Sequence, residues 1–259
     1  MRINSLNRQS FLDLVYSRKE EFLARIHAPE IFVVKNFYEK KELLALRNHV
    51  FEIGLKTEAS WHPLLDDCPD YHRLHDNYPQ AYVKSKMHSF YFHGWFDHNR
   101  DLFKRFSEIF EIKCFLGGIK ASDYVGSMPS SGAVARVNAQ NYPSGGGYIA
   151  EHIDPNSNYA LIQTLIQGSQ PGRDFRSGGL FARRAPNAEK IFLDFHTEVG
   201  DLMVLSPAIP HGVDPIDPEM EYRWENNSGK WTFLPLIVAS DYRDNKAAKP
   251  REINDSQRR

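Results

Sequence analysis

The sequence predicts a mostly β protein with helices in its N-terminal part, closed as an antiparallel sandwich or barrel. Two observations lead to this fold class. Short β-like runs follow one another after about residue 130, separated by clusters of Gly, Pro, Asn and Asp. Before that point, apolar residues recur at helical spacing in several stretches. The 259 residues are 41% hydrophobic and 25% charged, an ordinary globular composition, and we expect one domain over residues 1–259.

Three stretches in residues 1–130 have the apolar spacing of amphipathic helices. They are residues 8–26, residues 39–55 and HNRDLFKRFSEIFEI, residues 98–112. The run EIFVVKNF, residues 30–37, is rich in Val and Phe and predicts a strand between the first two helices. We therefore expect residues 1–130 to form a helical, lid-bearing N-terminal part of the domain.

Seven runs in residues 131–240 predict the strands of the barrel core. They are AVARVNAQNY, GGYIAEHI, ALIQTLIQ, GGLFARR, KIFLDF, DLMVLSP and WTFLPLIVAS. Residues 241–259 are polar and charged, and we expect them to form a frayed tail.

Composition excludes several classes of partner. Lys and Arg number 32 against 33 Asp and Glu, so no global basic field would attract nucleic acid. Charges interrupt the N-terminal stretch every few residues, unlike a signal peptide, and no segment approaches the roughly 18 apolar residues of a membrane span. The two cysteines, Cys68 and Cys114, make no disulfide framework. We expect a cytoplasmic protein without nucleic-acid or membrane partners, and the oligomeric state stays open.

Two segments carry side chains that suit a metal ion. His152 and Asp154 are two positions apart on a predicted strand, so both project from one face while Ile153 faces the other way. Taken alone, the pair is better interpreted as a surface histidine beside a turn-capping aspartate. However, His211 follows 59 positions later, enough chain for intervening strands to bring it back to the pair. Two imidazoles and a carboxylate on one side of a metal form the facial triad of non-haem iron oxygenases.

The order of these segments resembles that of the Fe(II)/2-oxoglutarate-dependent dioxygenase superfamily. ARVNAQNYPSGGGYIAEHID is similar to its strand-loop-strand that ends in H-x-D, and SGGLFARR to its Gly-Gly strand between the metal segments. GDLMVLSPAIPHGV is similar to the segment with the distal histidine, and the match covers roughly residues 133–240. The resemblance implies a double-stranded β-helix, or jelly roll, in which His152, Asp154 and His211 bind Fe(II).

The resemblance also implies the chemistry. Such an enzyme uses 2-oxoglutarate as co-substrate with O₂, releases succinate and CO₂, and hydroxylates an aliphatic C–H bond. Halogenating relatives have a small residue in place of the carboxylate, so Asp154 favours hydroxylation. The near-neutral charge favours a small-molecule substrate: an amino acid, a sugar derivative or a natural-product intermediate. Two alternatives remain, a hydroxylase of a protein side chain and a metal-holding, cupin-type binding protein or isomerase.

The family needs a cation for the distal carboxylate of 2-oxoglutarate, two positions before a Ser or Thr on a strand after the distal histidine. Lys230 and Thr232 match this pattern, 19 positions after that histidine, if a loop insertion is assumed. Arg223, at 12 positions, has the commoner offset and the better guanidinium fork but lies in a charged, loop-like stretch. We favour Lys230. Tyr142 and Asn138 are further candidates for hydrogen bonds to 2-oxoglutarate.

A second concentration of histidines lies in residues 61–98, among Trp and Tyr residues. Prolines bound its segment CPDYHRLHDNYP, and no CxxC or HExxH pattern accompanies it. We interpret the segment as a loop rather than a second metal site: an aromatic and polar lid over the barrel mouth, or a plain surface loop. Arg136 alternates with Asn138 and either lines the same cavity or forms a cross-strand ion pair.

Overall fold

Twelve strands and five α-helices make up the part of the chain that the computed structural model describes, residues 1–65, 68–79, 81, 83–126 and 132–240. The strands are β1 (Arg2–Asn7), β2 (Glu30–Lys35), β3 (Tyr71–Asp76), β4 (Ser85–His93), β5 (Ala133–Tyr142), β6 (Gly147–His152), β7 (Gln163–Gln167), β8 (Gly179–Ala182), β9 (Ile191–Phe192), β10 (Leu202–Leu205), β11 (His211–Ile216) and β12 (Lys230–Ala239). The helices are α1 (Arg8–Ser17), α2 (Lys19–His27), α3 (Lys40–Lys56), α4 (Arg100–Arg105) and α5 (Ser107–Gly117). The tail predicted over residues 241–259 lies outside the described residues.

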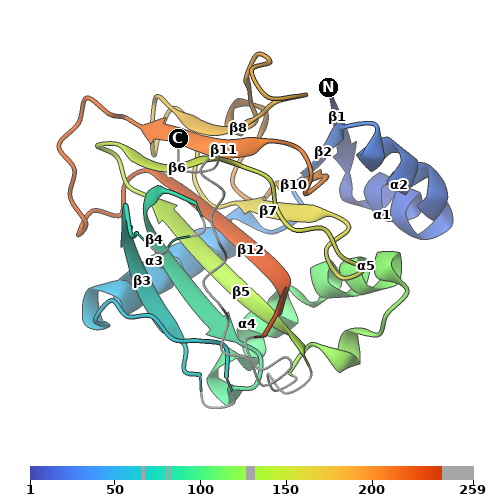
Figure 1. The fold of residues 1–259 in the computed structure, drawn as a ribbon, viewed down its shortest axis with the longest axis horizontal. Coiled ribbons are helices and arrows are strands. Elements are labelled where there is room, and N and C mark those ends of the chain that lie inside the picture. The colour runs from blue at the N-terminus through green and yellow to red at the C-terminus, as the bar shows by residue number, and fades with distance from the viewer. Residues whose placement is uncertain (66–67, 80, 82, 127–131, 241–259) are drawn as a thin grey trace.

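The strands form two layers that face each other (Figure 1). The order is β1-β2-β10-β7-β12-β5-β4-β6-β11-β8-β9, with β3 paired to β4. The strands β6, β11, β8 and β9 make the small layer and the others make the large one. A short pairing of Ser85 and Lys86 with Ile149 and Tyr148 joins the layers along one side. This arrangement confirms the predicted jelly roll with helices before it.

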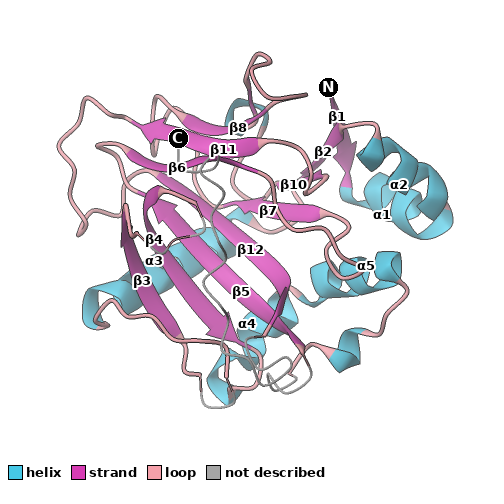
Figure 2. Ribbon diagram, in the orientation of Figure 1, coloured by secondary structure: helices cyan, strands magenta, loops and turns pink. Residues whose placement is uncertain are grey.

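Alternate residues of the large layer point to opposite faces, and each face has its own hydrophobic core. Outward-facing residues such as Trp231 and Phe233 pack in a cluster with the helices. Figure 2 shows α3 and α4 behind the large layer and α5 beside it. Inward-facing residues such as Leu165 and Leu234 pack in a second cluster between the two layers. The space between the layers is therefore walled by strands, and the helices cover the opposite face.

Two of the predicted helices are each divided in two. The helix predicted over residues 8–26 breaks at Arg18, whose φ of −134° and ψ of 46° leave the helical region. The break turns α2 relative to α1 so that Phe11 and Phe22 meet edge to face, 5.9 Å between ring centroids. The helix predicted over residues 98–112 likewise divides at Phe106 into α4 and α5. The helix predicted over residues 39–55 is confirmed as α3.

The prediction that CPDYHRLHDNYP is a loop is wrong. Its residues Tyr71–Asp76 form β3, which pairs antiparallel with β4. The sequence pattern does not predict this strand, because neither of its faces is uniformly apolar. His72 stacks on the ring of Phe90 at 4.6 Å on the helix side, while His75 lines the cavity on the other side. The histidine-rich segment thus belongs to the wall of the large layer.

Among the described residues, no helix combines the length and the apolar character that crossing a membrane requires.

Candidate active site

His152, Asp154 and His211 meet between the two layers. His152 ends β6 and His211 begins β11, and the two residues are direct partners in the pairing of these strands. Asp154 follows in the irregular segment after β6, where its backbone N–H donates to the carbonyl of Pro207 at 2.9 Å. One potential ligand atom from each of the three side chains lies within 4.8 Å of the others. Strand pairing therefore assembles the triad that the sequence separates by 59 residues.

Backbone carbonyls orient both imidazoles. The Nδ1 atom of His152 lies 2.8 Å from the carbonyl oxygen of Ala150, and Nδ1 of His211 lies 2.8 Å from that of Ile209. Because a carbonyl only accepts, each Nδ1 carries a hydrogen, so Nε2 of each imidazole presents a lone pair when that imidazole is neutral. The Nε2 atoms lie 3.7 Å (His152) and 3.3 Å (His211) from the Asp154 carboxylate.

Burial and mutual contact set the charges of the triad. Burial, and then the neighbouring His211, lower the pKa of His152 to about 4, so this imidazole is neutral at neutral pH. Burial alone would lower the pKa of His211, but the hydrogen bond and charge of Asp154 outweigh it and raise the pKa. The same contacts overcome burial to lower the pKa of Asp154, whose Oδ2 also accepts a hydrogen bond from the amide of Gln163. Two imidazole nitrogens and an ionised carboxylate are a donor set that fits Fe(II).

The triad opens into a cavity of about 270 Å³. Its wall on the large layer includes inward-facing residues of β5 and β12, and its opposite wall comes from β6, β8 and β11. Lys230, Thr232, Tyr142 and Gln140 line the same cavity, together with Arg136. The structure thus brings three of the sequence candidates for binding 2-oxoglutarate into one space with the triad.

Lys230 is fully buried and forms an ion pair. Its Nζ lies 2.5 Å from Oδ1 of Asp194 and 3.1 Å from Oε1 of Gln167. Two of its three N–H groups therefore have acceptors in the protein. Near it, the hydroxyl of Thr232 is buried and has no hydrogen-bond partner in the described part of the chain.

A glycine makes room for the partner of Lys230. Gly179, in the segment SGGLFARR, has a φ of +117°, and a Cβ built there would lie 2.7 Å from Oδ2 of Asp194. That oxygen also accepts a hydrogen bond from the backbone N–H of Leu180 at 2.6 Å. The close approach explains why glycine stands at this position of the strand.

The remaining candidates differ in their placement. The hydroxyl of Tyr142 donates to Oε1 of Gln140 at 2.8 Å, and burial raises the tyrosine pKa, so the hydroxyl keeps its proton. Asn138 is buried on β5 but does not line the cavity. Arg223 lies outside the cavity on the loop before β12, where it is exposed and pairs with Glu221 at 2.6 Å.

Sequence reasoning missed three polar partners in the site. Gln163 and Gln167 share the inward face of β7 with Leu165. Two glutamines four positions apart in an otherwise apolar run are a sequence signal that could have indicated polar groups on the inward face. Asp194 gives no such signal, because it lies in a 3₁₀ turn where the run KIFLDF predicts a strand.

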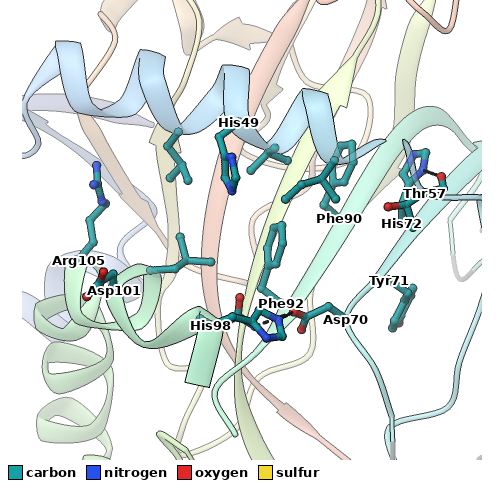
Figure 3. Close-up of a pocket in the computed structure, with 15 residues that line it drawn as sticks. His49, Thr57, Asp70, Tyr71, His72, Phe90, Phe92, His98, Asp101 and Arg105 are labelled. Atoms are coloured by element: carbon teal, nitrogen blue, oxygen red, sulfur yellow. Dashed lines mark hydrogen bonds and ion pairs between the residues drawn. The ribbon is translucent and has the colours of Figure 1, made fainter. Parts of the chain in front are cut away.

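A larger cavity, about 460 Å³, lies on the other face of the large layer. Figure 3 shows it between α3 and α4, with Phe90 and Phe92 of β4 on its inner side and His49 pointing in from α3. Asp101 and Arg105 of α4 lie at one end. No residue of the triad lines this cavity, so it is separate from the candidate metal site.

No protein-family model and no curated protein matches the sequence. Solved structures do. A full-length Neurospora crassa protein, in complex with alpha-KG and thymine, is 13% identical with a TM-score of 0.56, covering 92% of this chain and 86% of that one. A prolyl-4-hydroxylase of Pseudomonas putida is 10% identical with a TM-score of 0.50, covering 84% of this chain and 96% of that one. These likenesses confirm the fold that the resemblance implied, a double-stranded β-helix.

Proposed function

We propose that the protein is an Fe(II)- and 2-oxoglutarate-dependent oxygenase that hydroxylates an aliphatic C–H bond of a small molecule. One observation carries the proposal: His152, Asp154 and His211 converge in a cavity that also contains the buried cation Lys230. In the reaction, one oxygen atom of O₂ enters the C–H bond as a hydroxyl group, and the other enters succinate as 2-oxoglutarate loses CO₂. Fe(II) held by the triad supplies the redox chemistry that couples these two oxidations.

Residues around the triad hold the ligands in orientation. The carbonyls of Ala150 and Ile209 keep both Nε2 atoms directed at the metal position. The Gln163 amide donates to Oδ2 of Asp154 and thereby fixes the orientation of the carboxylate. His152, Asp154 and His211 would hold Fe(II) through three protein atoms, and the remaining coordination positions would be open to 2-oxoglutarate and O₂.

Lys230 is the residue that we assign to the distal carboxylate of 2-oxoglutarate. Asp194 and Gln167 accept two of its three N–H groups, so one N–H remains for a ligand. The unpartnered hydroxyl of Thr232 and the hydroxyl of Tyr142 lie in the same cavity and can add hydrogen bonds. Arg223 does not line this cavity, which supports Lys230 over Arg223 for this role.

The size of the cavity supports a small substrate. About 270 Å³ must hold 2-oxoglutarate together with the reacting part of the substrate, so only a small group fits beside the co-substrate. The Neurospora crassa structure of the same fold contains alpha-KG and the free base thymine together. Because Asp154 keeps its carboxylate, we assign hydroxylation rather than halogenation.

Anaerobic spectroscopy tests the proposal. Adding Fe(II) and then 2-oxoglutarate to the purified protein should produce a weak visible charge-transfer band, and the His211→Ala protein should not give it. A cupin-type binding protein would retain the metal without the band. After O₂ is admitted, candidate substrates should stimulate succinate formation, and the product should carry one atom from O₂. Absence of the band, or a chlorinated main product in high chloride, would contradict this function.

A further inference from the structure

We propose that Arg136 binds a carboxylate group of the substrate, so that the substrate is a small organic acid. This inference rests on the proposed function and assigns the substrate class of the same cavity. Arg136 lines the cavity that contains the triad. Four observations carry the assignment: its position, its lack of a counter-ion, the unpartnered oxygen of Asn138 two positions away on the same strand, and the scarcity of other cations.

Arg136 and Lys230 occupy different ends of the cavity wall. In the pairing of β5 with β12, Tyr142 is opposite Lys230, and Arg136 is opposite Leu236. Six residues of extended strand separate the two levels, about 20 Å between their Cα atoms. A dicarboxylate held by Lys230 therefore leaves the Arg136 end for a second ligand.

Arg136 has no ion pair with any carboxylate of the described residues, which removes the cross-strand pair considered from the sequence. Its guanidinium carbon lies 4.6 Å from the ring centroid of Tyr91, and its Nε is buried without a hydrogen-bond partner in that part of the chain. Asp70, which contacts the neighbouring His93, is already engaged with His98 and Asn99. A partly buried cation without an anion is costly, and a ligand carboxylate would supply the missing partner.

Unpartnered polar atoms follow the inward face of the large layer from Arg136 toward Lys230. Oδ1 of Asn138, two positions from Arg136 on β5, and the hydroxyl of Ser89, which is opposite Gln140, are buried without hydrogen-bond partners among the described residues. The hydroxyl of Ser85 and Nδ1 of His75 are also unpartnered, and strand pairing places them nearer the Lys230 end. Buried polar groups in native proteins nearly always have partners, so the unpartnered atoms along this face indicate a polar ligand, with Asn138 nearest to Arg136.

One cation favours a carboxylate over a phosphate. Of the described residues that line the cavity, Lys230 is the other lysine or arginine, and Asp194 already pairs with it. A single guanidinium fork matches the two oxygens of one carboxylate. Met87, Leu234 and Leu236 line the same cavity and can contact a short hydrocarbon part. A small aliphatic acid combines these features.

Calorimetric binding separates this inference from the oxygenase function. Small aliphatic, hydroxy and amino acids, each with its primary amide, are titrated into the protein with and without Mn(II) and 2-oxoglutarate, so that no turnover occurs. At least one acid should bind more tightly than its amide. Arg136→Gln should weaken the binding of that acid by about 10- to 100-fold, the loss expected for a charge-assisted hydrogen bond. Arg136→Lys should weaken it by less. Arg100→Gln, on an exposed part of α4, is the matched control and should leave binding unchanged.

The outcomes are distinct. If the proposed oxygenase function is wrong, the wild-type protein will not bind Mn(II) and 2-oxoglutarate. This result does not depend on which organic acids the protein binds. Arg136→Gln should keep Mn(II) and 2-oxoglutarate binding, which also shows that the variant is folded. Equal affinity for acids and amides, no binding of any acid, tighter binding of phosphate monoesters, or unchanged acid affinity in Arg136→Gln would overturn the assignment.

Discussion

The two faces of the large layer contrast sharply although they belong to the same strands. On β12, the outward-facing Trp231 and Phe233 are fully buried in a cluster with the helices. Their neighbours Lys230 and Thr232 face the cavity, and the hydroxyl of Thr232 lacks a partner among the described residues. On this strand the outward-facing side chains are apolar and packed against the helices, while the inward-facing ones include buried polar groups that line the cavity. Neighbouring positions of one strand thus contribute separately to the packed core and to the cavity lining.

The strongest test of the inner face is His211→Ala. It removes one of three proposed ligands, so Fe(II) retention and succinate formation should fall to background. The far-ultraviolet circular dichroism spectrum should stay that of the wild type, because the apolar core of the outer face is untouched. His27→Ala, at an exposed position of α2, is the control. Full activity in His211→Ala would contradict the assignment of His211 as a metal ligand.

The outer face is tested by adjacent substitutions on one strand. Trp231→Ala deletes a fully buried indole and should reduce the free energy of unfolding by about 3–5 kcal/mol. Thr232→Ala removes a hydroxyl that has no partner in the described part of the chain and should cost about 1 kcal/mol or less. Chemical denaturation measures both. If Thr232→Ala were the more destabilising, the conclusion that the outward-facing residues of β12 contribute more to stability than the inward-facing ones would be wrong.

The substitution Lys230→Ala tests whether this inward-facing lysine binds 2-oxoglutarate. Loss of a charge-assisted hydrogen bond should raise the concentration of 2-oxoglutarate that the protein requires by about 10- to 100-fold. Arg223→Ala should leave it unchanged, since Arg223 is exposed and outside the cavity. Titration of succinate formation measures both, and the reverse ranking would transfer the role to Arg223.

Lys230→Ala also leaves Asp194 buried without its cation, which destabilises the fold by itself. The double variant with Asp194→Asn is therefore needed as a control. It should recover thermal stability without recovering affinity for 2-oxoglutarate.

The smallest predicted effect is on the pH dependence of stability, and it concerns His88, a buried polar residue on the outer face. His88 hydrogen-bonds His72 at 2.8 Å, and burial, then the nearby His72, lower its pKa from 6.5 to about 4. The folded protein therefore resists protonation that the unfolded chain accepts. The stability that depends on neutral His88 is complete above pH 6.5 and declines as the pH falls toward 4, by about 1.4 kcal/mol at pH 5.5. His88→Gln should flatten the dependence of unfolding free energy on pH in this window, and an unchanged slope would contradict it.

Strong local patterns made much of the fold predictable. The run AVARVNAQNY coincides with β5, because its inward polar and outward apolar residues alternate regularly. The strands β3 and β4 were missed for the opposite reason. Imidazoles stacked under the helices and serines facing the cavity hide the alternation on which the prediction depends. Strand β1 was also missed, since its parallel pairing with β2 depends on residues far away in sequence.

The same distinction applies to the site. The relation between His152 and Asp154 is local, because Asp154 comes two positions after His152, although β6 ends at His152 and does not extend to Asp154 as the alternation predicted. The pairing of Lys230 with Asp194 joins residues 36 apart through a 3₁₀ turn, and no local pattern carries it. Sequence reasoning therefore found the residues that project from regular strands and missed the partner contributed by an irregular segment.

The direct pairing of His152 with His211 has a thermodynamic consequence. An ion bound by both imidazoles bridges β6 and β11 in the folded chain, and the unfolded chain offers no such bridge. Binding is thereby linked to unfolding: at a free metal concentration about 100 times the dissociation constant, the folded state gains about 2.7 kcal/mol. If the triad binds a metal ion, the temperature at which the protein unfolds should therefore rise with the concentration of free metal, and stability as well as activity would depend on the metal supply.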